Sequence, residues 1–238
     1  PGALIVVGNS VASSIPEILL DKTEVDVAVI GEGDVTIVEV LDKWINEQDL
    51  RGVKGIYYKK GNSIVRNPGR EVIADINTIP YQTYNIFDVE KYIQTHKITI
   101  GEPLPMERDR IRAFPVAYAR GCVAHCTFCY HCFRGARYRH RSARSVIDEI
   151  KLLQSLYGVN YIMTSDDLMF STKEQINDFL ELIAKERLDF YWTGIVRGNM
   201  FQSDADLDLL KKVKGAGCVR LGSALESADE EILKAMRK

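Results

Sequence analysis

The sequence predicts an α/β protein with two domains, because apolar strands alternate with amphipathic helices in two separate stretches of the chain. In residues 1–74 the alternation ends in a hairpin pattern, whereas in residues 116–238 it repeats as four strand–helix units. Residues 75–115 have a weaker period, which prolines interrupt. We therefore interpret residues 75–115 as an interdomain linker that lies on the surface of its neighbours.

The first domain is predicted to be a partial, Rossmann-like α/β unit with parallel strands. Its strands and helices are expected, in chain order, at residues 4–7, 16–20, 25–30, 35–44, 55–58 and 63–66. Pro16 suits the first turn of the short helix, where a missing N–H has no intrahelical partner to lose. The last two segments flank a Lys-Lys-Gly-Asn turn, which predicts a β-hairpin.

The second domain is predicted to be the start of a β/α barrel or of an open parallel sheet. Its strands are expected at residues 116–119, 160–164, 190–196 and 219–225, and a helix follows each of them. Ser142 or Ser145 is expected to cap the first of these helices. In either architecture, residues that carry chemistry gather where the parallel strands end. A cluster of cysteines directly follows the first strand, so this edge of the sheet is the expected site.

The bulk composition gives no sign of a membrane or nucleic-acid partner. The formal net charge is −2, and no apolar run approaches the ~20 residues that a membrane span needs. The first residues read as a buried strand rather than a signal peptide. Four of the five cysteines fall within eleven residues, which favours a metal site in the reducing cytoplasm over a disulfide framework. Because the chain opens on a strand and stops within a helical pattern, we expect a fragment of a longer protein.

The spacing of three cysteines indicates an iron–sulfur cluster. Cys122, Cys126 and Cys129 follow a Cys-x3-Cys-x2-Cys pattern, and three thiolates in one loop can reach three corners of a 4Fe–4S cubane. Three ligands leave one iron open for a substrate or cofactor. A structural zinc site more often uses two separated cysteine pairs, and a zinc-stabilised binding module is the weaker alternative.

The segment from Arg120 to Cys129, RGCVAHCTFC, resembles the signature of radical S-adenosylmethionine enzymes. The resemblance implies that the open iron chelates S-adenosylmethionine and that an electron from the cluster cleaves it to a 5′-deoxyadenosyl radical. It also implies a partial (β/α)6 barrel, of which this chain holds four units. A small organic substrate and an electron donor such as flavodoxin or ferredoxin complete the expected system.

Further positions resemble one large branch of that family, which carries a cobalamin-binding domain upstream of the barrel. The resemblance implies that Phe128 packs beside the cluster near the adenine, and that Asp166 or Arg197 meets the methionine end of S-adenosylmethionine. Glu226, followed by Ser227 in a Glu-Ser motif, is expected to bind the ribose. Alanine stands where the branch has glycine two residues before Glu226.

The first domain resembles the second half of that cobalamin-binding domain, through the turns that contain Gly8, Gly31 and Gly33. Asn9 replaces a glycine of the family pattern, and the Asp-x-His-x-x-Gly segment is absent. We therefore expect weak or no cobalamin binding by this chain. Methyl transfer to an unactivated carbon is the commonest outcome that the resemblance implies, and cyclisation or rearrangement is the other.

Several residues near the cluster motif have more than one interpretation. Cys132 as a fourth ligand would make the chain a four-cysteine electron-transfer module, whereas we favour a spare thiol. His125 and His131 are expected to be polar loop residues. The arginines of residues 134–144 form either a solvated charge run or a site for phosphate or carboxylate groups, and the lack of interleaved aromatic residues beyond Tyr138 argues against nucleic acid. Cys218 is expected in the core.

Overall fold

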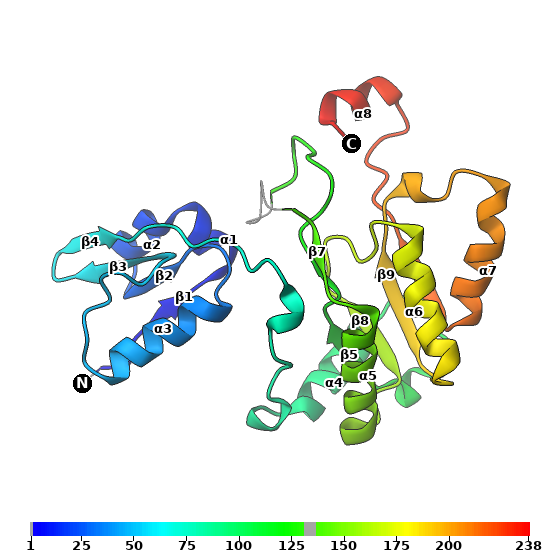
Figure 1. Cartoon of the computed structure of the whole chain (residues 1–238), viewed down its shortest axis with the longest axis horizontal. Helices are drawn as coiled ribbons and strands as arrows, with labels where there is room; N and C mark the ends of the chain where they lie inside the picture. The colour runs from blue at the N-terminus through cyan, green and yellow to red at the C-terminus, as the bar shows by residue number, and fades with distance from the viewer. Residues whose placement is uncertain (1, 131–136) are drawn as a thin grey trace. The chain divides into compact units, whose positions relative to one another are not determined.

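The computed structural model describes residues 2–130 and 137–238 (Figure 1). Their contacts form two compact units, the first made of residues 2–74 with Cys129 and Tyr130, and the second made of residues 75–128 and 137–238. Each unit contains a four-stranded sheet with helices packed against it. The predicted α/β class with parallel strand pairing is confirmed.

The first unit has a mixed sheet of order β1-β2-β3-β4. Its elements are β1 (Val6–Val7), α1 (Asn9–Ser14), α2 (Pro16–Lys22), β2 (Val27–Val29), α3 (Asp34–Ile45), β3 (Ile56–Lys60) and β4 (Ser63–Arg66). The β1–β2 pair is parallel, and the predicted hairpin β3–β4 joins β2 in the antiparallel sense. Helix α1 was not predicted, because its Ser-rich sequence lacks an apolar period and its amino terminus has no side-chain cap.

Helices bury both faces of this sheet, which explains why β2 is a continuous apolar run. Val27 and Val29 pack with Val40 of α3, whereas Ala28 packs on the other face with Ala12 of α1 and with α2. The alternation of side chains along one strand therefore supplies two small cores.

The second unit has a four-stranded sheet of order β10-β9-β8-β5, in which every pair is parallel. The sheet and its helices are β5 (Ala113–Val116), α5 (Ala143–Tyr157), β8 (Tyr161–Thr164), α6 (Lys173–Lys185), β9 (Tyr191–Ile195), α7 (Leu207–Gly215), β10 (Cys218–Gly222) and α8 (Glu230–Met236). A separate two-stranded ribbon consists of β6 (Ala119–Arg120) and β7 (Arg139–His140). The predicted succession of four β/α units is confirmed.

Local signals in the sequence set the ends of these helices. Ser142 caps α5 by accepting a hydrogen bond from the Ser145 N–H, so the first of the two predicted caps is the one used. Thr172 and Gln175 form a capping box at the start of α6. The apolar faces of α5 and α6 pack on the sheet around Trp192, which is fully buried.

Residues 75–115 differ from the predicted linker, because they belong to the second unit and contribute to its core. They contain η1 (Ile76–Thr78), η2 (Tyr84–Ile86), α4 (Val89–Thr99), η3 (Arg108–Arg110) and most of β5. Ile100, Ile111 and Ala113 form a buried cluster with Tyr161. The sequence did not reveal this packing, because prolines interrupt the apolar period of residues 75–115. Pro115 lies within β5, which is an edge strand of the sheet, where a residue without an N–H is tolerated.

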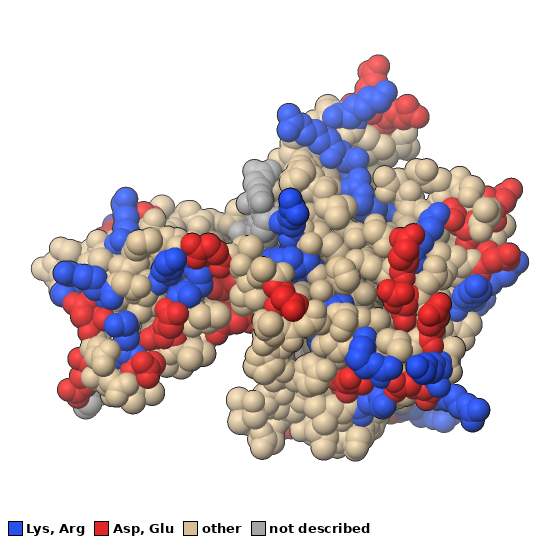
Figure 2. All heavy atoms as spheres, in the orientation of Figure 1, with Lys and Arg blue, Asp and Glu red and all other residues tan. Residues whose placement is uncertain are grey.

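Charged side chains of both signs are interspersed over the face of the molecule shown in Figure 2. Within the part of the chain that the structure describes, no helix combines the length and apolar character needed to cross a bilayer.

Candidate functional site

The parallel strands of the second unit end at one edge of the sheet, and the predicted site residues lie in the segments that follow them. The longest segment follows β5 and contains residues 121–138, which we call the cysteine loop; residues 131–136, with His131 and Cys132, lie outside the described residues. Asp166 follows β8, Arg197 follows β9, and Glu226 follows β10. This placement agrees with the general location of chemistry in β/α folds.

A short antiparallel ribbon closes the base of the cysteine loop. Ala119 pairs with His140 and Arg120 pairs with Arg139, so the chain enters through β6 and leaves through β7. Gly121 follows the ribbon with a φ of +80°, a conformation that strains residues with a side chain. The glycine therefore allows the chain to turn immediately before the first cysteine of the motif.

The three cysteines of the motif differ in their exposure to solvent. Cys126 is buried, Cys122 is partly exposed and Cys129 is exposed. The Ala124 N–H donates to the Cys122 sulfur over 3.5 Å. Three thiols within eight residues are a donor set that suits iron, because thiolates are the ligands of iron–sulfur clusters. Among residues 2–130 and 137–238, no three Cys, His, Asp or Glu side chains are already gathered as a metal site, so ligation by these cysteines stays a prediction.

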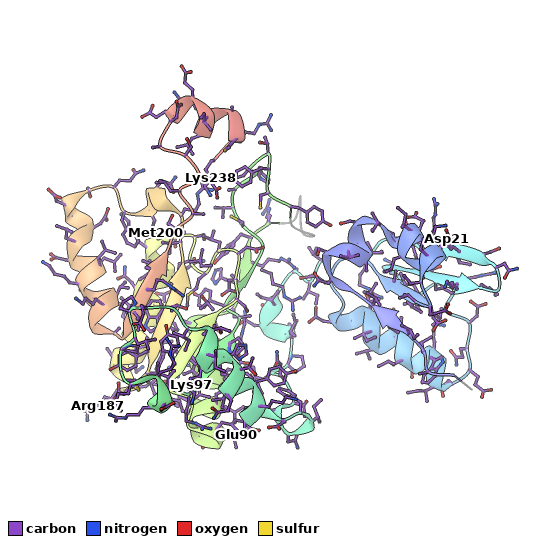
Figure 3. All side chains as sticks on the ribbon, turned by 180° about the vertical axis from the view of Figure 1, so that it is seen from behind. Asp21, Glu90, Lys97, Arg187, Met200 and Lys238 are labelled. Atoms are coloured by element: carbon purple, nitrogen blue, oxygen red, sulfur yellow. The ribbon has the colours of Figure 1, made fainter. Side chains whose placement is uncertain are left out.

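Three of the predicted cofactor-binding residues contact one residue, Lys238. The Lys238 ammonium lies 5.9 Å from the centre of the Phe128 ring and 3.5 Å from a Glu226 carboxylate oxygen. The Arg197 guanidinium donates to the Lys238 carbonyl over 3.4 Å. Figure 3 labels Lys238 beside α8. The structure thus brings together an aromatic ring, a carboxylate and a guanidinium from three separate loops.

The segment after β10 has an unusual backbone. Glu226 has a φ of +62°, which is uncommon for a residue with a side chain. The Ser227 hydroxyl accepts a hydrogen bond from the Asp229 N–H over 3.0 Å, in the turn that leads into α8. The Thr127 N–H of the cysteine loop donates to the Met236 carbonyl over 2.8 Å. These contacts hold the segment close to the cysteine loop.

Asp166 faces the strand that enters the cysteine loop. Its carboxylate accepts hydrogen bonds from the backbone N–H groups of Tyr118, at 3.0 and 3.1 Å, and of Ala119, at 2.8 Å. The side chain is buried, and burial raises the pKa of Asp166 to about 6, although the two N–H groups oppose this shift. Its expected contact with S-adenosylmethionine stays a prediction.

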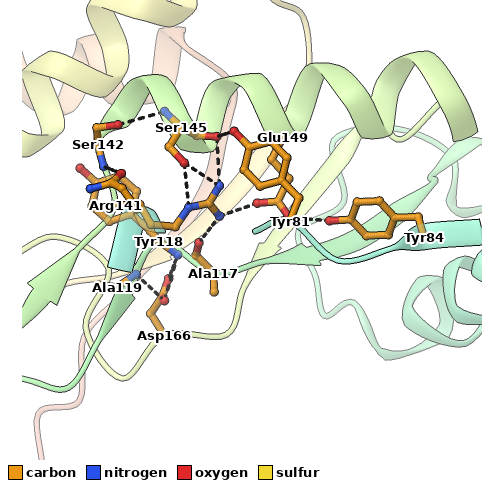
Figure 4. A network of polar contacts seen from close by, with 11 residues as sticks. Tyr81, Tyr84, Ala117, Tyr118, Ala119, Arg141, Ser142, Ser145, Glu149 and Asp166 are labelled. Atoms are coloured by element: carbon orange, nitrogen blue, oxygen red, sulfur yellow. Dashed lines mark hydrogen bonds and ion pairs between the residues drawn. The ribbon is translucent and has the colours of Figure 1, made fainter. Parts of the chain in front are cut away.

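A buried polar network that sequence reasoning missed lies beside the ribbon (Figure 4). Arg141 pairs with Glu149 of α5, and its guanidinium also donates to the Ala117 carbonyl over 2.9 Å. Tyr84 donates its hydroxyl to the other oxygen of Glu149, and burial, with Glu149 beside it, raises the pKa of Tyr84 above its usual range. The sequence contained one signal of this network, because Glu149 falls on the apolar face of α5 beside Val146. For Arg141, the structure therefore corrects the interpretation of a solvated charge run.

The three predicted glycines of the first unit lie where its two parallel strands end. Gly8 follows β1 and precedes α1, while Gly31 and Gly33 separate β2 from α3. A Cβ added at Gly8 or at Gly33 would lie 4.0 or 3.8 Å from the Val29 side chain, respectively. Asn9 has a φ of +75°, a conformation that glycine favours and asparagine tolerates, which gives a physical reason for glycine in the family pattern.

The fold and the site define a protein with a partial β/α barrel and a three-cysteine loop after the first barrel strand. The sequence pattern of the Radical SAM superfamily matches residues 116–238. The chain therefore belongs to the Radical SAM superfamily, whose enzymes use a 4Fe–4S cluster and S-adenosylmethionine.

Curated relatives match almost the whole chain. An uncharacterised methyltransferase of Pyrococcus horikoshii is 28% identical over 98% of this chain and 48% of its own length. An anaerobic magnesium-protoporphyrin IX monomethyl ester cyclase of Synechocystis is 26% identical over 93% of this chain and 41% of its own. A cytidylyl-2-hydroxyethylphosphonate methyltransferase of Streptomyces wedmorensis is 24% identical over all of this chain and 47% of its own. The chain thus spans about half the length of these relatives.

Solved structures share the fold. The cobalamin-dependent S-adenosylmethionine radical enzyme OxsB aligns with a TM-score of 0.74 at 19% identity, over 100% of this chain and 33% of that one. The radical S-adenosylmethionine methyltransferase TsrM of Kitasatospora setae, solved with cobalamin and a 4Fe–4S cluster, aligns with a TM-score of 0.71 at 16% identity, over 97% of this chain and 44% of that one.

Proposed function

We propose that this chain is the cofactor-binding core of a radical S-adenosylmethionine enzyme of the cobalamin-associated branch. It acts on a small organic substrate, by methyl transfer or by a ring-forming or rearranging reaction. Relatives named as methyltransferases and as a cyclase support both outcomes. A cytoplasmic electron donor such as flavodoxin or ferredoxin supplies the electron.

The observation that carries this proposal is the convergence of Phe128, Arg197 and Glu226 on Lys238, next to the cysteine loop. These three side chains offer a stacking surface, a cation and an acceptor within one small region. S-adenosylmethionine presents the matching groups, namely an adenine ring, a carboxylate and ribose hydroxyls.

Each residue of the site has a role that follows from its chemistry. Cys122, Cys126 and Cys129 hold the cluster as thiolates. Arg197 binds the cofactor carboxylate through its planar fork of N–H donors. Glu226 accepts hydrogen bonds from ribose hydroxyls, supported by Ser227 in the same turn. When bound, the cluster and S-adenosylmethionine supply one-electron reductive cleavage of the sulfonium bond, and the protein supplies placement and exclusion of water.

Cobalamin binding is a separate part of the proposal, and the first unit is its candidate site. The turns at Gly8, Gly31 and Gly33 lie at the ends of parallel strands, where α/β sheets bind nucleotide-like groups. Optical titration with hydroxocobalamin tests this part. We expect weak or no binding by the 238-residue chain, and a micromolar dissociation constant would contradict that expectation.

Electron paramagnetic resonance of the anaerobically reconstituted, dithionite-reduced chain tests the cluster and its open iron. We expect a 4Fe–4S signal that changes when S-adenosylmethionine is added. Alanine at Cys122, Cys126 or Cys129 should abolish the signal, whereas Cys218→Ala, which changes a cysteine far from the motif in the sequence, should retain it. A colourless chain with one bound zinc would overturn the proposal.

Cys132 provides the test against an electron-transfer module. If the cluster has three protein ligands, Cys132→Ala keeps both the cluster and its response to S-adenosylmethionine. If Cys132→Ala loses the cluster while the parent keeps it, the chain has four cysteine ligands and the enzyme proposal fails.

A further inference from the structure

The cysteine loop is fixed at both of its ends by buried carboxylates that lie far away in the sequence. Asp166 binds the entering strand, and Glu149 binds the departing strand through Arg141. Both carboxylates are less than 10% exposed. Burying a carboxylate costs free energy unless the group is paired or hydrogen-bonded. The contacts of Asp166 and Glu149 offset this cost.

At the entrance of the loop, Asp166 binds the backbone. It accepts hydrogen bonds from the N–H groups of Tyr118 and Ala119, which lie four and three residues before Cys122. These are consecutive N–H groups on a strand that bends away from the main sheet into the ribbon. Asp166 satisfies both donors and thereby fixes the direction in which the chain approaches the first cysteine.

At the exit of the loop, Arg141 bonds back to the entering strand twice. Its backbone N–H donates to the Tyr118 carbonyl over 2.8 Å, and its guanidinium donates to the Ala117 carbonyl over 2.9 Å. The same guanidinium contacts Glu149 and the Ser145 carbonyl of α5. Arg141 therefore joins the two ends of the loop to each other and to the first barrel helix.

The residues before the barrel complete the enclosure of this ion pair. Tyr84 donates its hydroxyl to Glu149, and the Tyr81 ring lies 5.2 Å from the Arg141 guanidinium carbon. The Tyr81 hydroxyl donates to the Ser145 carbonyl over 2.8 Å. The ion pair is thus shielded from water on the side of residues 81–84, which strengthens its electrostatic interaction.

We propose that Asp166, Arg141 and Glu149 are positioning residues of the cysteine loop, which set the geometry in which its thiols meet the cluster. This inference rests on the proposed function for the cluster itself. None of the three residues touches the cluster or S-adenosylmethionine in this role. They act through the backbone of residues 117–120 and 139–141.

Hydrogen–deuterium exchange of the apo chain and cluster spectroscopy of the reconstituted chain test the proposal together. The variants are Asp166→Ala, which removes the acceptor, Asp166→Asn, which keeps one acceptor oxygen, and Glu149→Gln, which removes the charge opposite Arg141. Arg144→Ala is the matched control. Arg144 lies on α5, as Glu149 does, but it forms an exposed ion pair with Asp148 and Glu186.

Exchange of the amides of residues 117–120 and 139–141 should rise about tenfold in Asp166→Ala and in Glu149→Gln, while amides of α6 stay protected. The same variants should lose iron to a chelator about tenfold faster and should alter the line shape of the reduced cluster. Asp166→Asn should restore most of the parent behaviour, and Arg144→Ala should match the parent.

Two results would overturn the proposal. In the first, exchange at both ends of the loop is unchanged in Asp166→Ala and Glu149→Gln. In the second, exchange rises but iron loss and line shape match the parent, so that the network only stabilises the fold. If the parent binds no cluster, the proposed function fails, and unchanged exchange still rejects the fixing of the loop.

Discussion

Arg141 and Glu149 form an ion pair whose side chains are only 13% and 8% exposed. Removing one partner of a buried pair leaves the other charged and unpaired, which typically costs about 3–5 kcal/mol. The pair therefore has consequences for the stability of the whole second unit, which can be measured without any cofactor.

We predict that Glu149→Gln lowers the free energy of unfolding of the apo chain by about 3 kcal/mol. Urea denaturation followed by circular dichroism measures this loss. Arg144→Ala, which removes an exposed pair, should cost no more than about 1 kcal/mol. Equal losses of unfolding free energy in the two variants would show that the buried Arg141–Glu149 pair stabilises the fold no more than the exposed pair does.

Asp166 should make stability depend on pH. Its pKa in the folded chain is raised to about 6 from 3.8, mainly by burial, with Asp167 adding to the shift and Arg141 opposing it. Because the pKa of Asp166 is raised in the folded chain, its stabilising contribution to the free energy of unfolding is complete below about pH 4. This contribution is lost as the pH rises through 6.

The parent chain should therefore lose about 2–3 kcal/mol of unfolding free energy relative to Asp166→Asn between pH 4 and pH 8. Denaturant titrations of both proteins across this range measure the difference. Asp167→Asn, which changes the exposed neighbour, should keep most of the parent slope. Parallel pH profiles for the parent and Asp166→Asn would contradict the prediction.

Gly217→Ala should be strongly destabilising, by about 3 kcal/mol or more. Gly217 has a φ of +85°, and a Cβ there would lie 2.2 Å from the Phe190 carbonyl oxygen, which belongs to the backbone just before β9. Gly215→Ala is the control, since a Cβ at Gly215 meets no atom within 4 Å. Thermal unfolding compares the two variants, and similar midpoints would refute the steric argument.

The cysteines should differ widely in reactivity before any cluster is assembled. Burial raises the pKa of the Cys218 thiol to about 12, whereas Cys129 is exposed. In the folded apo chain at pH 8, iodoacetamide should modify Cys129 about 100-fold faster than Cys218. Peptide mass spectrometry at successive times measures both rates, and the denatured chain, where the rates should converge, is the control.

Arg197→Ala should weaken S-adenosylmethionine binding to the reconstituted chain about 10- to 100-fold, the value of a charge-assisted pair of hydrogen bonds. Equilibrium dialysis with labelled cofactor measures the dissociation constant. Arg187→Ala, which removes an exposed arginine before β9, should bind like the parent. An unchanged constant in Arg197→Ala would remove Arg197 from the proposed site.

The sequence by itself determined the α/β class, the hairpin, the four β/α units and the three-cysteine motif. These features are local, because the apolar period within one strand or helix and the spacing within one loop are read from neighbouring residues. Ser142 and Thr172 mark helix starts for the same reason, since a cap depends on residues three positions away.

Only the tertiary structure decided how distant segments meet. It placed residues 75–115 within the second unit, because burial of Ile100 and Ile111 depends on a sheet that forms elsewhere in the chain. It paired Arg141 with Glu149, and it brought Phe128 and Glu226 into contact with the same residue, Lys238, although they are 98 positions apart in the sequence. Long-range contacts of this kind depend on the packing of whole elements, which no local pattern of residues specifies.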